Sequence, residues 1–339
     1  MGSLGEKNMK SRILTLFGSG ETSPHMAKNY RFILDKLDYT LQDNFLLDTP
    51  FGFQENNQVL SKKIQDYFSN KINLNLKNLN LTSEESYQDN HKTLLSEADF
   101  IFSGPGSPTY ASKIWLNNNL DKVLKEKLNN GVVMAFASAA ALTLGKYVIP
   151  VYEIYKVGQN ENLKDGLNVL DFLGKDTVIV PHFNNQEGGD HDTSHCFIGK
   201  KRFDKLINGL DVITIGIEEH TSLTFDLNNS TIDVKGLGNV HFISNDGEFC
   251  LKNGETIEIG QINDNYVPKK SSNEIKSEPK ESFNNSGTVE LDINSLIEIR
   301  RIARESKMYQ IADNIRDLLI TKGIEIIDND AETSWKKLD

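Results

Sequence analysis

Short apolar runs alternate with longer amphipathic stretches over the first half of the chain. The runs span residues 13–17, 45–47, 74–81, 100–102, 132–136 and 178–180. Apolar runs of this length, bounded by turn residues, predict strands that are buried on both faces, and the stretches between them predict helices. Strands that alternate with helices form a mostly parallel sheet with helices on both sides. We therefore expect an α/β fold, a three-layer sandwich.

The pattern changes in the segment "SLTFDLNNSTIDVKGLGNVHFISNDGEFCLKNGETIEIG", residues 222–260. Short β-type runs are separated there by Asn-Asn, Gly and Asp-Gly turns, which are typical of antiparallel hairpins. We expect an antiparallel β meander that closes the sheet at its C-terminal end.

Three segments differ in composition from this central domain, residues 12–262. Residues 1–11 are polar and predict a disordered N-terminus. Residues 263–290 contain mainly Lys, Ser, Glu, Asn and Pro, and they predict a flexible linker because so few apolar groups cannot offset the entropy of ordering. Residues 291–339 show helical periodicity and predict a small separate helical module.

Composition and charge narrow the function classes for the 339-residue chain. A formal net charge of -11 and a pI near 5.2 argue against a general affinity for nucleic-acid phosphates. The two cysteines, far apart in the chain, predict neither a disulfide framework nor a metal-ligand cluster and fit the cytoplasm. No apolar run approaches the roughly 20 residues that span a bilayer, so no membrane partner is expected.

Ser138 lies where the apolar run "VVMAF" meets the helical stretch "AAALTL". In α/β folds a nucleophile often occupies this turn between a strand and a helix, where free N–H groups of the helix can bind an oxyanion. Serine is also a common N-cap, so this position alone fits a structural role equally well.

Two further strand ends carry groups that a serine nucleophile needs. His182 follows the run "DTVIVP", and Glu218 and Glu219 follow "DVITIGI". The carboxyl ends of parallel strands meet at one edge of a sheet, so we expect these side chains to share a crevice with Ser138. A serine, a base and a carboxylate that orients the base form a hydrolytic triad.

The segments "FASAAA", "HF" and "GIEEHT" together resemble the dipeptidase E and cyanophycinase group of serine peptidases, whose fold is similar to that of class I glutamine amidotransferases. The resemblance covers roughly residues 13–243. It implies a peptidase in which Ser138 is the nucleophile, His182 the base and Glu219 the acid that orients His182. Glu153 is the alternate acid, because some members place a carboxylate soon after the nucleophile helix.

The loop "SGPGSPTYA" resembles the Gly-rich loop that supplies an oxyanion N–H in that group. The resemblance makes the backbone N–H groups of Gly104 or Gly106 the donors beside that of Ala139. The chain departs from the group at Phe136, two residues before Ser138, where a small residue is usual, and this predicts a relaxed turn. The arginine that is expected shortly after His-Phe is also missing, which predicts a changed substrate.

The segment "NNQEGGDHDTSH" stands in place of that arginine and is dense in polar groups. With the segment "VYEIYKVG", which alternates like a half-buried strand, it supplies the candidate substrate-binding residues Glu153, Tyr155, Asn184, Asn185, Glu187 and Asp192. Carboxylates in this position favour a cationic or amine-bearing substrate. A helix would bring His191 and His195 to one face, but Gly188 and Gly189 favour a solvated loop, so no metal is expected.

A nucleotide cofactor is not expected either. The glycines of "LFGSGET" lack the third glycine of a dinucleotide fingerprint, and they fit a tight turn between a strand and a helix. We therefore predict no cofactor.

The stretch "RRIARESKMYQIADNIRDLLITKGIEIIDNDAETSW" resembles the extreme C-terminus of bacterial-type cysteinyl-tRNA synthetases, which belongs to their anticodon-binding part. The resemblance implies contact with tRNA through the candidate RNA-binding residues Arg300, Arg304, Lys307, Arg316 and Trp335. The interleaved acidic residues equally fit an ordinary solvated helix. No segment resembles the catalytic domain of a synthetase.

The sequence thus predicts a serine-type hydrolase that cleaves a small peptide or amide, with a homodimer as an open alternative to a monomer. A second hypothesis is a non-catalytic scaffold that binds tRNA or a protein partner through the C-terminal module. Acyl transfer to an amine or a tRNA-linked acceptor is a third. The sequence does not distinguish transfer from hydrolysis.

Overall fold

The structure is a computed structural model that describes residues 10–262 together with residues 296–297, 300–301, 315–316, 319, 324–328 and 333–337. The chain divides into two compact units, Met1–Lys269 and Lys270–Asp339. Most of the predicted N-terminal segment and all of the predicted linker, residues 263–290, lie outside the described residues.

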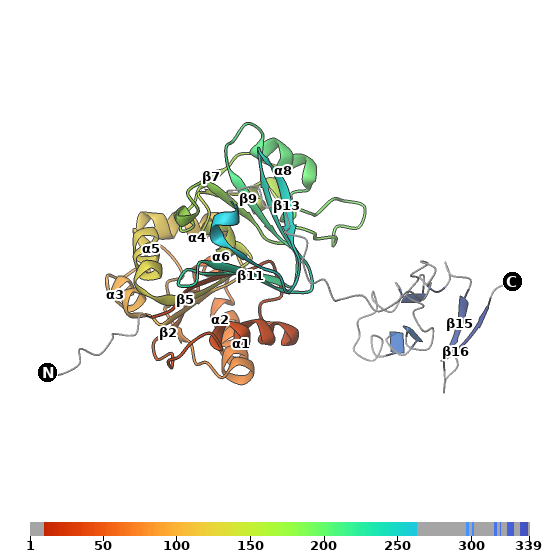
Figure 1. The fold of residues 1–339 in the computed structure, drawn as a ribbon, viewed down its shortest axis with the longest axis horizontal. Coiled ribbons are helices and arrows are strands. Elements are labelled where there is room, and N and C mark those ends of the chain that lie inside the picture. The colour runs from red at the N-terminus through yellow and green to blue at the C-terminus, as the bar shows by residue number, and fades with distance from the viewer. Residues whose placement is uncertain are drawn as a thin grey trace, which may run out of the picture. The chain divides into compact units, whose positions relative to one another are not determined.

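An eight-stranded sheet forms the centre of the first unit, in the order β14-β11-β10-β1-β5-β4-β2-β3 (Figure 1). Its parallel strands are β1 (Arg12–Phe17), β2 (Asn44–Leu46), β3 (Lys77–Asn78), β4 (Phe100–Ser103) and β5 (Val132–Ala137). The strands β10 (Thr221–Asp226), β11 (Thr231–Gly236) and β14 (Thr256–Glu258) extend it in antiparallel pairing.

A second sheet of six strands has the order β13-β12-β9-β8-β6-β7. Its parallel strands are β6 (Tyr147–Val148), β8 (Thr177–Val180) and β9 (Ile213–Ile217), and its antiparallel strands are β7 (Lys164–Asp165), β12 (Val240–Ser244) and β13 (Gly247–Leu251). The chain passes between the sheets at the turn after β9, because β10 pairs with β1.

The described part of the first unit contains eight α-helices: α1 (Ala27–Leu34), α2 (Asn57–Tyr67), α3 (Asn90–Glu97), α4 (Pro108–Asn117), α5 (Leu120–Asn130), α6 (Ala139–Thr143), α7 (Val151–Tyr155) and α8 (Lys200–Ile207). Single turns of tighter helix lie at Pro24–Met26, Thr49–Phe51, Asp171–Leu173 and Ile259–Ile262, and a π turn lies at Phe68–Ile72.

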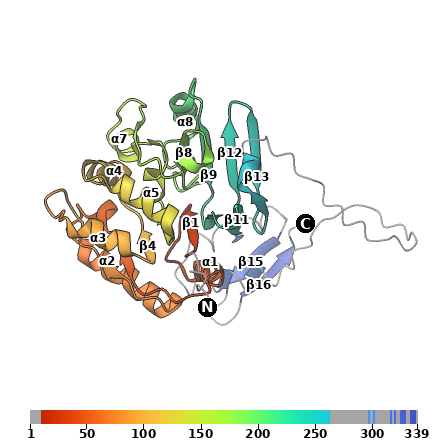
Figure 2. The same cartoon turned by 60° about the vertical axis from the view of Figure 1, so that its left-hand side comes forward.

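The apolar side chains form a separate cluster on each face of the eight-stranded sheet. Along β5, Met134 and Phe136 join the cluster that includes α4 and α5, and Val133 and Ala135 join the cluster that includes α1 and α2. This alternation is what a strand buried on both faces requires. The helices lie on both sides of the sheet (Figure 2). The predicted α/β fold class is confirmed, although the strands are divided between two sheets and do not form one.

Two segments differ from the predicted elements. The segment "VYEIYKVG" contains the helix α7 and not a strand, because Val151 and Ile154, three residues apart, are both buried in a third apolar cluster. The predicted strand 74–81 pairs only at Lys77–Asn78, although Leu74 and Leu76 are buried as its alternation predicts.

The second unit contains helical residues at 296–297, 300–301 and 315–316, as its periodicity predicts. It also contains an antiparallel pair, β15 (Ile324–Asp328) and β16 (Thr333–Lys337). The helical module that the sequence predicts therefore also contains strands in its last part, where apolar and polar residues alternate.

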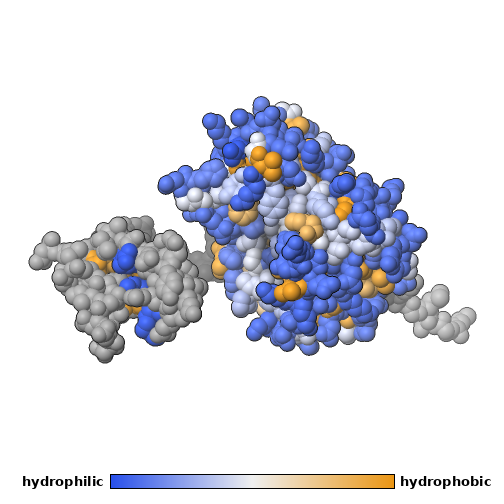
Figure 3. Space-filling view, turned by 180° about the vertical axis from the view of Figure 1, so that it is seen from behind, coloured by the Kyte–Doolittle hydropathy of each residue, from blue (hydrophilic) through white to orange (hydrophobic). Residues whose placement is uncertain are grey.

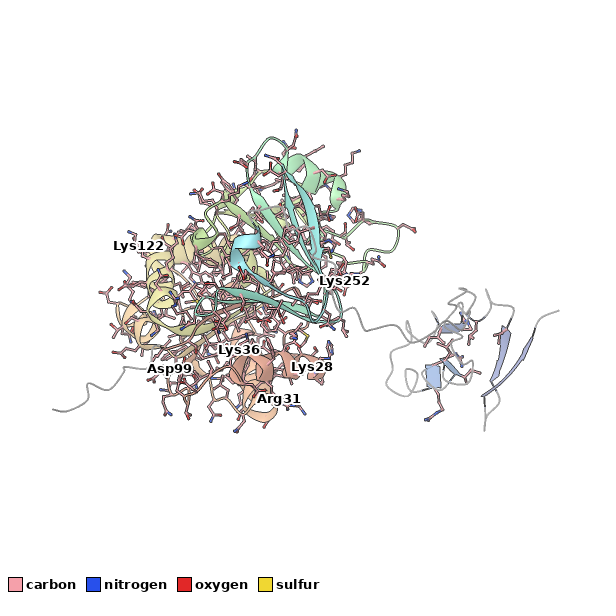
Figure 4. All side chains as sticks on the ribbon, viewed as in Figure 1. Lys28, Arg31, Lys36, Asp99, Lys122 and Lys252 are labelled. Atoms are coloured by element: carbon pink, nitrogen blue, oxygen red, sulfur yellow. The ribbon has the colours of Figure 1, made fainter. Side chains whose placement is uncertain are left out.

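The surface of the first unit is mostly polar. On the face in Figure 3 the hydrophobic residues are scattered and do not gather in one patch. Lys36, labelled in Figure 4, follows α1, and its Nζ lies 2.9 Å from Asp233 and 3.3 Å from Asp226. The helix is thereby linked to β10 and β11. Among the described residues, no helix combines the length and apolarity that a bilayer crossing needs.

Asp48 offers a test of the core beside β2. The residue is 1% exposed, its Oδ1 accepts the N–H of Leu81 at 3.0 Å, and burial raises its pKa to about 6. When the pKa of a carboxyl is higher in the folded than in the unfolded protein, the free energy of unfolding falls as the pH rises through the folded pKa. In Asp48→Asn, the melting temperature should therefore fall less between pH 4.5 and pH 8 than in the native chain.

The exposed Asp38→Asn variant is the control and should follow the native pH dependence. Equal pH dependence of all three proteins, measured by thermal denaturation, would contradict the assignment.

Candidate active site

Ser138 occupies a strained turn between β5 and α6. Its backbone has φ 50° and ψ −119°, a conformation that L-residues rarely adopt. Such strain persists only where the surroundings enforce it, and it commonly marks functional sites. Phe136 does not relax the turn, because its ring is buried and packs edge-on against Trp115 of α4. The prediction of a relaxed turn is therefore wrong.

His182 faces Ser138 from the end of β8. The distance between Ser138 Oγ and His182 Nε2 is 2.9 Å, and His182 Nδ1 lies 3.0 Å from Glu219 Oε1. The three side chains form one continuous chain of hydrogen bonds. It is satisfied when Nδ1 carries the imidazole proton and donates to Glu219, which leaves Nε2 to accept from the serine hydroxyl.

Two asparagines of the loop that follows His182 hold Glu219 in place. Asn185 Nδ2 donates to Glu219 Oε1 at 2.7 Å, and Asn184 Oδ1 accepts the Glu219 N–H at 2.8 Å. The hydrogen bond from His182, with a further contribution from Asn185, lowers the pKa of Glu219. The carboxylate stays ionised toward lower pH than usual. Both were predicted as substrate-binding residues; Asn185 contacts the Glu219 carboxylate, and Asn184 contacts the Glu219 backbone N–H.

The end of β1 brings the two sheets together at the site. The Ser138 N–H donates to the Phe17 carbonyl at 3.2 Å, and the His182 N–H donates to the Gly18 carbonyl at 3.2 Å. A Cβ atom on Gly18 would lie 2.1 Å from the Glu218 carbonyl oxygen. Only glycine therefore allows the turn after β9 to approach so closely. The sequence predicts all three groups at the edge of one sheet, whereas Ser138 follows a strand of the eight-stranded sheet, and His182 and Glu219 follow strands of the other.

A left-handed turn at residues 195–197 also contacts His182. His195, Cys196 and Phe197 are consecutive non-glycine residues with φ of 54°, 59° and 69°. The Cys196 N–H donates to the His182 carbonyl at 3.3 Å, and the Phe197 ring lies 4.9 Å from the imidazole between centroids. Each left-handed residue lowers the free energy of unfolding by about 1 kcal/mol, so this contact forms at a cost in stability.

The candidate oxyanion donors lie beside the nucleophile. Ala139 is the first residue of α6, where an N–H has no acceptor within the helix. Ala139 and Gly106 line one small cavity together with Ser138. A Cβ on Gly106 would lie 2.0 Å from the Pro50 carbonyl oxygen, so this loop position requires glycine. The Gly104 carbonyl accepts the Ala140 N–H at 3.2 Å, which ties the loop to α6.

A buried carboxyl, Glu21, lies close to the same loop and was not predicted from the sequence. Glu21 is 7% exposed, and a Cβ on Gly104 would lie 3.8 Å from its Oε1. Burial raises the pKa of Glu21, while the nearby imidazoles of His182 and His220 act in the opposite direction. In the sequence, the one feature that could have indicated Glu21 is its position directly after the turn "GSG" that follows β1.

The other predicted site residues lie further from the hydroxyl. Glu153 Oε1 accepts from Thr109 Oγ1 at 2.6 Å, so the structure does not bring this alternate acid to His182. Tyr155 and Glu187 line a neighbouring cavity of about 310 Å³. Asp192 accepts the N–H groups of Ser194 and Lys200 and so lies at the start of α8.

His191 and His195 do not share a helical face. The His191 ring stacks on Tyr155, and the buried His195 ring packs against Phe183 and Phe203. Burial lowers the pKa of His195 to about 4. In the part of the chain that the structure describes, no group of three or more metal-ligating side chains occurs.

The predicted RNA-binding residues are only partly described. Arg316 is exposed, whereas Arg300 is only 6% exposed. Arg304 and Lys307 lie outside the described residues, as does the side chain of Trp335.

Comparison with known proteins adds a family. Residues 15–232 match the profile of Peptidase family S51. A peptidase from an acI-B1 Actinobacterium has a similar structure, with a TM-score of 0.59 and 24% identity over 73% of this chain and 96% of that one. A putative peptidase E protein from Listeria monocytogenes aligns with a TM-score of 0.46 and 18% identity over 68% of this chain and all of its own. The first of these similarities supports the fold alone.

Curated relatives are named cysteine-tRNA ligases. The protein from Brachyspira hyodysenteriae is 28% identical over 55% of this chain and 34% of its own length. Those from Thermosynechococcus vestitus and Treponema denticola are 42% and 45% identical over 17% of this chain and 13% of theirs. The chain thus spans about a third or less of the length of these relatives. The Brachyspira match is longer than everything after Ile262, so it includes part of the first unit.

The strain at Ser138 predicts an unusual ranking of two variants. Glycine adopts φ 50° without a Cβ penalty, so Ser138→Gly should be more stable than Ser138→Ala by about 1 kcal/mol. Thermal denaturation of both variants measures the difference. Ser112, inside α4, is the matched control: there glycine should be less stable than alanine by roughly 0.5–1 kcal/mol. The same ranking at both serines would contradict a strained Ser138.

Proposed function

The chain belongs to Peptidase family S51, a family of serine peptidases, and from this premise we propose that it hydrolyses the amide bond of a small peptide or amide. Ser138 is the nucleophile, His182 the general base and acid, and Glu219 the carboxylate that orients His182. The observation that carries the proposal is the 2.9 Å contact between Ser138 Oγ and His182 Nε2 at a strained turn.

In the first half of the reaction, Ser138 Oγ attacks the substrate carbonyl carbon and His182 Nε2 takes the hydroxyl proton. The carbonyl oxygen becomes an oxyanion, for which the N–H groups of Ala139 and of Gly104 or Gly106 are the donors. The C–N bond then breaks, His182 returns its proton to the leaving amine, and an ester to Ser138 remains.

In the second half, water attacks the ester carbonyl and gives a proton to His182 Nε2. The proton passes to Ser138 Oγ as the C–O bond breaks, and a free carboxylic acid leaves. Glu219 stabilises the imidazolium in both halves, and its lowered pKa keeps it charged for that role.

Fluorophosphonate labelling tests the nucleophile. An activated serine should react once per chain, and intact-mass measurement should show one adduct. Ser138→Ala and His182→Ala should each lose the adduct, because members of a triad act as a unit. Ser194→Ala, which changes a serine on the loop after His182, should keep it. An adduct that survives in Ser138→Ala would rule out this serine as the nucleophile.

The pH dependence of labelling tests Glu219. Asn185→Ala removes a hydrogen bond that lowers the Glu219 pKa, so this carboxylate should take up its proton at higher pH as the solution is acidified. The acid limb of the labelling rate should therefore move to higher pH, and the rate at neutral pH should fall about tenfold. The exposed Asn162→Ala variant is the control. Identical limbs in Asn185→Ala and the native chain would contradict the role of Glu219.

RNA contact by the second unit is a separate proposal, supported by the similarity to proteins named cysteine-tRNA ligase. The exposed Arg316 is the described candidate for a phosphate contact. Filter binding of tRNA to the full chain and to Arg316→Ala tests it, with weaker binding expected for the variant. Equal binding by both proteins would exclude Arg316 from the contact.

A further inference from the structure

Two cavities of very different size share Tyr152 as a lining residue. The smaller, about 40 Å³, is lined by Ser138 itself together with Ala139 and His182. The larger, about 750 Å³, opens next to it. Tyr152 lines both cavities, so the two spaces adjoin at this side chain.

The small cavity restricts the group that lies directly at the hydroxyl. Leu142, Val151 and Phe197 form its walls, and Cys196 lies among them. Leu142, Val151 and Cys196 are at most 4% exposed and belong to one packed apolar cluster, so the cavity does not widen without repacking. A water molecule needs roughly 10–15 Å³ of such space, so a cavity near 40 Å³ holds only a small side chain and not an aromatic ring. His182 is the one basic residue among those that line this cavity, so the lining does not favour an acidic side chain.

The large cavity has aromatic walls. Phe53 is 51% exposed and Tyr152 is 42% exposed, which is unusual for such large apolar groups, and the Phe53 ring packs edge-on against Tyr110 at 5.2 Å. Aromatic rings that are open to solvent in a cavity of this size are typical of a ligand site.

Glu153 adds a polar feature to the large cavity. Its Oε1 accepts from Thr109, whereas its Oε2 is buried and has no hydrogen-bond partner in the described chain. An unsatisfied buried acceptor favours a ligand that brings an N–H or O–H donor and disfavours an anionic ligand. Tryptophan and tyrosine side chains combine a ring with such a donor.

We infer that the substrate is asymmetric in size, with a small side chain on one side of the scissile bond and a bulky aromatic side chain on the other. The cavity at Ser138 receives the small group, and the cavity of Phe53, Tyr110 and Tyr152 receives the ring, with Glu153 as its acceptor. The inference rests on the proposed peptidase function and names the substrate class for the same site.

Four dipeptides test the asymmetry: Ala-Ala, Ala-Trp, Trp-Ala and Trp-Trp, each free and as the N-acetyl amide, incubated with the full chain and followed by chromatography. One of the two mixed peptides should be cleaved at least tenfold faster, in kcat/KM, than both Ala-Ala and Trp-Trp. Trp-Trp cleaved as fast as the better mixed peptide, or Ala-Ala cleaved as fast, would overturn the inference.

Labelling separates this inference from the proposed function. If Ser138 reacts with the fluorophosphonate but none of the four peptides is cleaved, the substrate class is wrong and the nucleophile stands. If Ser138 does not react and nothing is cleaved, the peptidase function fails and the inference fails with it.

Variants then assign each cavity. Phe53→Ala should raise KM for the better mixed peptide about tenfold, with little change for Ala-Ala, because only the ring contact is lost. Leu237→Ala, which removes another exposed apolar side chain, should leave both unchanged. Val151→Ala enlarges the small cavity, so it should accept valine in place of the small residue several-fold better than the native chain does. This gain cannot arise from misfolding, and its absence would contradict the small-cavity assignment.

Discussion

The carboxyl end of β1 is the point on which the rest of the site depends. Carbonyl groups of consecutive residues, Phe17 and Gly18, accept the N–H groups of Ser138 and His182, which come from different sheets. The missing side chain of Gly18 lets the Glu218 carbonyl, and with it the turn that carries Glu219, approach. Main-chain hydrogen bonds between strand ends thus set the distances among the three side chains.

This assembly concentrates unfavourable backbone conformations around one imidazole. Ser138, His182 and the turn 195–197 all have positive φ, which each costs about 1 kcal/mol or more. Two well-packed sheets supply the stability that offsets this strain. In these conformations the Ser138 hydroxyl points at His182, and the Phe197 ring packs against the His182 imidazole. Asn184 and Asn185 hold Glu219 behind it. Contacts within the chain alone hold this arrangement, which is the preorganisation that the proposed mechanism needs.

Much of this could be predicted from the sequence, and the exceptions have physical causes. Alternating apolar runs indicate the α/β fold, and Ser138, His182 and Glu219 each follow such a run. Pairing between distant strands leaves no local pattern, so the division into two sheets could not be foreseen. Glu153 followed the nucleophile helix in sequence but bonds to Thr109, a partner 44 residues earlier. Asn184 and Asn185 were expected to face substrate, because their segment stands in place of the missing arginine. Their bonds to Glu219 could not be foreseen, because Glu219 lies 34 or 35 residues further along the chain.

A crystal structure of the fluorophosphonate-treated protein tests the central claim most directly. The account predicts phosphorus bonded to Ser138 Oγ, with the phosphonyl oxygen within hydrogen-bond distance of the Ala139 N–H and of a glycine N–H in the loop Gly104–Gly106. His182 should lie between the adduct and Glu219. Phosphorus on another residue, or an adduct on Ser138 whose oxygen points away from both N–H groups, would contradict it.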